Sequence, residues 1–151
     1  MAKFVFSLQS ILNIKLKMET QAKQAFAVAK NRLDEEEQRL EELYQRKNSY
    51  EEHAKELLQG TLRIRDIEDN KNAILMMDAF ISDQQKRVER AKIQLEYERE
   101  QMTEAVKERK TYETLREQAF EEFLQDENKA ESKAVDELVS YTYGQRMAES
   151  V

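Results

Sequence analysis

The sequence predicts an all-α protein in which two long helices fold back on each other as an elongated antiparallel two-helix coiled-coil hairpin. The 151-residue chain has no proline and two glycines, and these are the residues that most often interrupt a helix. Charged residues make up 37% of it and the mean hydropathy is −0.88, a composition typical of coiled coils. A seven-residue apolar repeat runs on both sides of Gly60. We therefore expect a single coiled-coil domain over residues 1–151.

The first helix is predicted over about residues 7–58. Its seam positions alternate by three and four residues, a pattern that favours a coiled coil over an ordinary amphipathic helix. Four of these positions are polar, namely Lys15, Glu19, Glu36 and Lys47. The full set is Leu8, Leu12, Lys15, Glu19, Ala22, Phe26, Ala29, Leu33, Glu36, Leu40, Leu43, Lys47, Tyr50, Ala54 and Leu57. Ser7 is a suitable N-cap, since its hydroxyl can accept from an amide of the first turn.

A connector is predicted over about residues 59–70, and a second helix over about 71–143. The second repeat comprises Ile74, Met77, Ile81, Gln84, Val88, Ala91, Leu95, Glu98, Met102, Ala105, Arg109, Tyr112, Arg116, Ala119 and Phe123. A short connector favours antiparallel packing, and the longer second helix should extend past its partner beyond about residue 120. Gly144 is expected to end that helix and leave a frayed end.

The charged seam residues predict a register, because a buried charge needs an opposite charge beside it. Pairing positions whose numbers sum to about 128 satisfies three of them. The expected pairs are Lys15 with Glu113, Glu19 with Arg109, and Glu36 with Lys92. In this register Leu8 faces Phe120.

The charge distribution argues against nucleic acid as a partner. The whole net charge of −6 arises after residue 60, and no basic stripe is evident, whereas phosphate binding needs one. The absence of cysteine excludes disulfides and thiolate metal sites. The most apolar N-terminal stretch, residues 4–18, is too short and polar to span a bilayer. We expect a soluble, cytoplasmic protein.

No catalytic, cofactor-binding or metal site is expected. His53 is the one histidine and lies beside Glu51, Glu52 and Glu56. A helical di-iron site requires a Glu-x-x-His motif on each of two helices, but position 50 is tyrosine and no second histidine exists. The chain is therefore not expected to be an enzyme.

The N-terminal segment is the first candidate binding surface. Phe4, Phe6 and Leu8 alternate before the helical repeat begins. One interpretation is that Phe4 and Phe6 close the end of the hairpin against Phe120 and Phe123. Another is that this aromatic tip docks on a second protein, and a third is a lipid-surface helix over residues 4–18.

The second candidate surface is the most apolar run of the chain, residues 73–81. A two-helix seam uses only Ile74, Met77 and Ile81 of this run, which leaves other apolar side chains outside it: Leu75, Met76 and Phe80. Exposed apolar patches often mark partner sites, and methionine suits adaptable binding. A short third helix built from residues 61–70 could equally cover this face.

Three sequence patterns resemble the FliJ family of the bacterial flagellar type III export apparatus. They are Phe4-x-Phe6-x-Leu8-x-x-Ile11-Leu12, Tyr112-Glu113-x-x-x-Glu117 leading to Phe120-x-x-Phe123, and Glu131-x-Lys133-x-x-Asp136-Glu137-Leu138. The resemblance implies a stalk similar to the rotary stalk subunit of F- and V-type ATPases. It also implies three partners, which are the hexameric export ATPase, the linker of the export-gate membrane protein and the export chaperones.

The resemblance assigns expected contact residues. The gate-contacting positions of the family correspond to Ala73 and Met77, and an aromatic is missing at Ala73, so Ile74, Phe80 or Ile81 could substitute. The ATPase tip would use the N-terminal segment and the facing end of the second helix, namely Phe4, Phe6, Leu8, Leu12, Phe120 and Phe123.

The expected function is that of a non-enzymatic flagellar export component. It would promote ATPase assembly and activity, couple them to export, and escort chaperones, as a monomer at the cytoplasmic face of the inner membrane at the flagellar base. The alternative is a generic structural or tethering coiled coil, for instance a homodimeric spacer.

Overall fold

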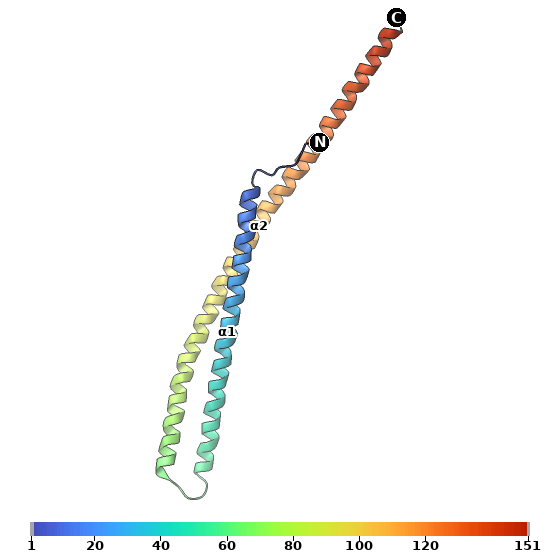
Figure 1. The fold of residues 1–151 in the computed structure, drawn as a ribbon. Helices are drawn as coiled ribbons and strands as arrows, with labels where there is room; N and C mark the ends of the chain where they lie inside the picture. Colours follow the sequence, from blue (N-terminus) through green and yellow to red (C-terminus); the bar gives the residue numbers. More distant parts are fainter. Residues whose placement is uncertain (1, 151) are drawn as a thin grey trace. The chain divides into compact units, whose positions relative to one another are not determined.

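The structure, a computed structural model, describes residues 2–150 and contains two helices within that range (Figure 1). Helix α1 spans Gln9–Leu57 and helix α2 spans Ile64–Glu149. The two run side by side in opposite directions and are joined by a single loop (Figure 1). Neither is accompanied by a strand within residues 2–150. The predicted all-α helical hairpin is confirmed.

The chain divides into two compact units, and each contains part of both helices. The terminal unit comprises Met1–Glu19 and Ala105–Val151, and the loop unit comprises Thr20–Glu104. In the terminal unit, the start of α1 packs on the second half of α2. In the loop unit, the rest of α1 packs on the first half of α2, and the connecting loop closes this unit.

Within each unit, the seam positions predicted from the heptad repeat include the side chains that are buried between the helices. The apolar side chains with the least exposure fall on predicted seam positions, apart from Phe6 in the N-terminal segment. They are Leu12 and Ala105 in the terminal unit, and Ala29, Met77, Ile81, Val88 and Ala91 in the loop unit. Two predicted seam positions, Tyr50 and Arg116, stay exposed. At the first, Asn70 is buried beside the Tyr50 backbone and donates from Nδ2 to its carbonyl oxygen at 3.1 Å.

Helix α1 begins at Gln9, two residues later than predicted. The Leu8 carbonyl oxygen accepts the first helical bond, from the Leu12 amide at 3.0 Å, so Leu8 occupies the N-cap position. The Gln9 amide donates to the Phe6 carbonyl at 3.1 Å, which forms a turn through Ser7. The prediction of Ser7 as N-cap is therefore wrong.

The connector is shorter than predicted, spanning 58–63 instead of 59–70. Gly60 has φ +82°, the left-handed conformation that glycine adopts most readily. The Ile67 amide donates to the Arg63 carbonyl at 3.2 Å, which starts α2 at once. Residues 64–70 are thus the first turns of α2, where Ile67 and Asn70 pack on α1. Within residues 2–150 no third helix covers the apolar run, so that alternative is wrong.

Helix α2 does not stop at Gly144 but continues to Glu149, so the predicted stop and frayed end are wrong. A glycine inside a helix costs only about 1 kcal/mol relative to alanine, and good helix formers follow this one, namely Gln145, Arg146, Met147 and Ala148. Across it, Gln145 Nε2 donates to the Tyr141 hydroxyl at 2.8 Å. Residues 128–150 are exposed throughout.

Candidate partner-binding surfaces

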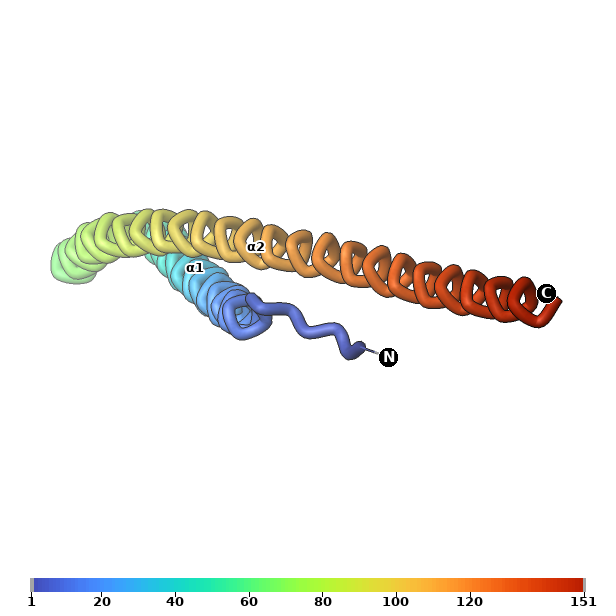
Figure 2. Tube along the Cα trace, turned by 90° about the horizontal axis from the view of Figure 1, so that it is seen from above, coloured from blue at the N-terminus to red at the C-terminus, as the bar shows by residue number. Residues whose placement is uncertain are grey.

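An aromatic cluster closes the terminal unit. The extended N-terminal segment (Figure 2) places the Phe4 ring 5.1 Å from Phe120 and 5.5 Å from Phe123, between ring centroids. The Arg116 guanidinium lies 5.6 Å from the Phe4 ring, which adds a cation–π attraction. Edge-to-face ring pairs add to simple area burial. The interpretation in which Phe4 closes the hairpin end is confirmed.

Arg116 is exposed and contacts the aromatic cluster instead of packing in the seam. Besides its position over Phe4, its Nε donates to Gln9 Oε1 at 3.0 Å. Arg116 thus contacts both the first residue of α1 and the non-helical segment of residues 2–8, which we call the strap.

The six predicted tip residues differ in accessibility. Phe6 and Leu12 are buried, and Phe4, Leu8 and Phe123 are half-buried. Phe120 is 43% exposed and packs on the Phe4 ring. The structure adds exposed apolar neighbours on α2, namely Leu115 and Leu124. Leu115 lies off the seam repeat, so periodicity did not single it out.

A buried ion pair links the helices in the terminal unit. Arg109 Nε and Nη2 donate to the two Glu19 carboxylate oxygens at 2.6 and 3.2 Å, and Nη1 donates to Glu113 at 2.7 Å. These bonds raise the pKa of Arg109, with the Glu19 bond as the larger cause. The predicted Glu19–Arg109 pair is confirmed. Lys15, however, pairs with Glu108 at 2.9 Å instead of Glu113, and this bond raises the pKa of Lys15.

In the loop unit, the buried carboxylate of Glu36 has a different partner from the one predicted. Gln84 Nε2 donates both to the Glu36 carboxylate and, at 3.0 Å, to its backbone carbonyl. Arg39 adds a contact at 3.3 Å from the same helix. Lys92 is exposed. The neutral amide at seam position 84 thus takes the place that the register assigned to Lys92.

Two further polar contacts cross between the helices of the loop unit. Lys47 Nζ lies 2.7 Å from Asp78 Oδ1, and this hydrogen bond raises the pKa of Lys47. Gln85 Nε2 donates to the Tyr44 hydroxyl at 2.7 Å. Such polar pairs beside a seam specify register more than they add stability.

The apolar run 73–81 separates into seam and surface. Met77 and Ile81 are 8% and 6% exposed and lie within the seam, and Ala73 and Ile74 are half-buried. The side chains outside the seam are Leu75, Met76 and Phe80, which are 56%, 57% and 45% exposed. Of the predicted gate residues, Phe80 is therefore the accessible one.

The described residues offer no metal or membrane-spanning feature. No group of three or more His, Cys, Asp or Glu in residues 2–150 could hold a metal ion. His53 lies on the surface, with Nδ1 3.5 Å from Glu56 Oε2. Within the same range, neither helix combines the length and apolarity needed to cross a bilayer.

The fold and its surfaces define a class of protein: an antiparallel two-helix coiled coil that presents aromatic, apolar and charged side chains to partners. The sequence model of the family "Flagellar FliJ protein" matches residues 4–148. The chain belongs to the FliJ family and is a component of the flagellar type III export system. The family predicted from the three sequence patterns is confirmed.

A solved structure has the same fold. It is that of a chain described as a YscO homolog, CT670 from Chlamydia trachomatis, with a TM-score of 0.63 and 20% sequence identity. The match covers 95% of this chain and 98% of the other. A search of curated proteins found no match.

Proposed function

We propose that the chain is a non-enzymatic stalk that binds the hexameric export ATPase and the export gate. In this role it promotes assembly and turnover of the ATPase, couples turnover to export, and escorts export chaperones. The observation that carries the proposal is the FliJ match over residues 4–148 of a chain that folds as one two-helix hairpin. We place the chain at the flagellar base, as a peripheral protein on the cytoplasmic face of the inner membrane.

The terminal unit supplies the ATPase-contacting surface in this proposal. Its strap fastens the two helices together through Phe4, so the pair can enter a ring without separating. Phe120 and the neighbouring Leu124, both more than two-fifths exposed, are available for contact. The buried Phe6 and Leu12 support this surface from within.

The test is the turnover rate of the purified export ATPase with and without the chain. We expect stimulation by the wild type, and its loss in Leu124→Asp, since a charge there prevents apolar contact. A matched control is Val28→Asp, because Val28 is exposed and lies in the loop unit. Leu8→Asp with Leu12→Asp should also abolish stimulation, by opening the hairpin end. Absence of both binding and stimulation by the wild type would refute the stalk function.

The loop unit supplies the gate-contacting surface. Phe80 stands beside an open groove of about 480 Å³ whose other lining residues include Leu43 and Arg46. Phe80 and Leu43 are the apolar members of an otherwise charged and polar lining, and an exposed aromatic beside such a groove suits an anchoring contact with a linker peptide. Ala73 and Ile74 extend this surface, whereas Met77 and Ile81 hold it in place from the seam.

Binding of a purified gate-linker peptide tests this surface. We expect Phe80→Asp to weaken the affinity by about tenfold, which corresponds to loss of one anchoring aromatic. Ile93→Asp is the control, because Ile93 is exposed in the same helix and unit. Equal affinities for Phe80→Asp and wild type would remove the gate contact from this face.

A further inference from the structure

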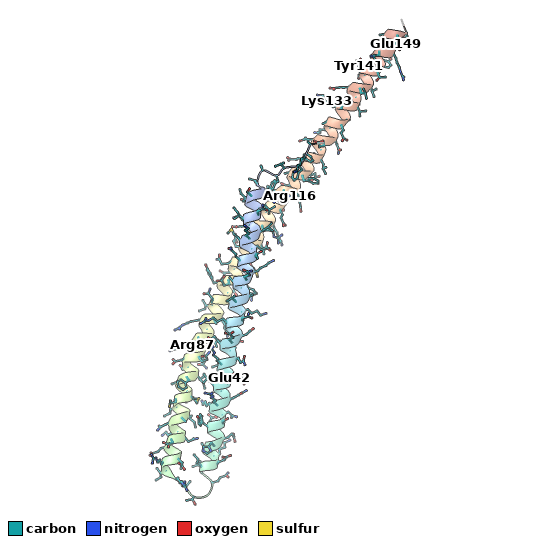
Figure 3. The ribbon with its side chains drawn as sticks, in the orientation of Figure 1. Glu42, Arg87, Arg116, Lys133, Tyr141 and Glu149 are labelled. Atoms are coloured by element: carbon teal, nitrogen blue, oxygen red, sulfur yellow. The ribbon has the colours of Figure 1, made fainter. Side chains whose placement is uncertain are left out.

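Arginines gather on one flank of the seam in the loop unit. On α1, Arg32, Arg39 and Arg46 are spaced seven residues apart, each directly before a seam position, so they share one side of the helix. On α2, Arg87 and Arg90 likewise each precede a seam residue. Figure 3 labels Arg87 on this helix.

Three of these arginines line one open groove of about 500 Å³, which we call the arginine groove: Arg32, Arg87 and Arg90. Its remaining lining residues are Glu36, Ala91 and Gln94. Glu36 is the one acid among them, and its side chain is 5% exposed and already bound by Gln84 and Arg39. The groove therefore presents guanidinium groups without an available carboxylate.

The ion pairs of the loop unit do not use these arginines. Within residues 2–150 no ion pair joins Arg32, Arg87 or Arg90 to an acid. In the cross-helix polar contacts, Tyr44, Asp78 and Gln85 each follow a seam position instead, and Lys47 is itself a seam position. These contacts therefore do not use the flank on which the arginines lie.

Stability of the hairpin does not explain the arginine groove. Residues flanking the seam of a coiled coil normally carry opposite charges that set orientation and register. Here Arg32 on α1 and Arg87 on α2 line the same groove, and like charges in such positions are destabilising. An arrangement that works against the fold is a mark of a functional surface.

We propose that the arginine groove is a docking site for a carboxylate-rich helical segment of a partner protein. Guanidinium groups bind carboxylates through two parallel hydrogen bonds, which lysine cannot do. Arg87 and Arg90 line the groove three residues apart on α2, about 4.5 Å along the helix axis, which is the spacing of carboxylates one turn apart on a second helix. Ala91 is the small apolar residue of the lining, and its methyl group leaves room for such a helix. A nucleic acid or an anionic membrane fits less well, because an extended array of phosphates needs a long basic stripe, whereas this groove is lined by three arginines.

The test is fluorescence anisotropy with the full chain and a labelled alanine-based helical peptide bearing glutamates on one face. We expect saturable binding that weakens with salt. Arg87→Glu with Arg90→Glu should weaken it by at least about tenfold, the effect of losing charge-assisted bonds. Arg63→Glu with Arg65→Glu is the matched control, because it makes the same charge change at exposed positions of the same unit and should lose less than about twofold.

Circular dichroism separates loss of the site from loss of the fold. We expect the Arg87/Arg90 reversal to keep its helix content and to unfold at a higher temperature than wild type, since it relieves repulsion. Arg87→Gln with Arg90→Gln provides a milder second variant, expected to weaken binding in the same direction.

Three results would overturn the proposal. One is that the glutamate peptide does not bind, or that it binds no more tightly than a peptide in which glutamines replace the glutamates. Another is an equal loss in both double variants, which would indicate a non-specific charge effect. The third is tighter Arg87/Arg90-dependent binding to phosphatidylserine vesicles or to single-stranded RNA than to the glutamate peptide.

Discussion

At the scale of single residues, Leu12 is the most buried apolar side chain of the hairpin, at 4% exposure. Leu12→Ala removes three carbons from the closed end of the terminal unit and leaves a cavity. We expect the free energy of unfolding to fall by about 2–3 kcal/mol, measured by urea denaturation. Leu138→Ala, at an exposed position of the unpaired part of α2, should change it by less than about 0.5 kcal/mol. Similar losses in the two variants would contradict the assignment of Leu12 to the seam.

The Lys47–Asp78 pair gives the loop unit a predictable response to alkali. Its hydrogen bond raises the pKa of Lys47 in the folded state above the ordinary value of 10.5. The stabilisation is therefore fully present below the unfolded pKa and is lost as the pH rises through the folded one. We expect the difference in thermal midpoint between wild type and Lys47→Gln to be constant from neutral pH to about pH 10, and to shrink above it. A difference that grows with pH would contradict the pair.

At the scale of elements, the two glycines should respond to alanine in opposite ways. Gly60 has φ +82° in the loop, where an alanine side chain costs about 1 kcal/mol or more. Gly144 lies inside α2 with open space around it, where alanine favours the helix by about 0.5–1 kcal/mol. We expect Gly60→Ala to lower the global unfolding free energy, and Gly144→Ala to raise only the helix content near the C-terminus. Hydrogen exchange distinguishes the local effect from the global one.

The last stretch of α2 is a helix without a packing partner, since residues 128–150 are exposed throughout. A chain ending at residue 127 should therefore unfold at the same midpoint as the full chain, with helix content reduced in proportion to the residues removed. A lower midpoint in the thermal scan would show that this stretch stabilises the hairpin.

At the scale of the whole molecule, the seam pairs α1 and α2 of one chain, so no second chain is needed to bury it. We expect sedimentation equilibrium to give the mass of a single chain, 18.0 kDa, independent of protein concentration. A mass twice as large would favour the homodimeric spacer that the heptad repeat alone also allows.

The heptad repeat allowed most of the seam to be predicted, because a two-helix coiled coil buries whichever stripe recurs every seven residues. Leu12, Met77 and Ile81 were all placed correctly on this basis. The ends of the helices were predicted less well. Ser7 and Gly144 carry good local signals for caps, but those signals are worth about 1 kcal/mol each and yield to the packing or helix propensity of their neighbours.

The candidate surfaces were also predicted in part by the repeat and in part not. That Phe4 meets Phe120 and Phe123 was foreseeable from the alternation at the N-terminus and the longer second helix. That Met77 is buried while Phe80 is exposed also follows from the repeat. The exposure of Leu115 likewise follows from its position outside the repeat, but no sequence pattern marked it as a candidate contact residue.

The amino-acid order is sufficient to specify a helical hairpin that turns at Gly60, since helix propensity, heptad spacing and a lone loop glycine all act through near neighbours in the chain. The partners of the polar seam residues required the packed coordinates. Glu19 takes Arg109 as charge pairing suggested, but Glu36 takes Gln84. Several donors lie within reach of a buried carboxylate, and a shift of one turn changes which of them is nearest. Folding of the two helices against each other settles that choice, and it also brings Arg32 of α1 into one groove with Arg87 and Arg90 of α2.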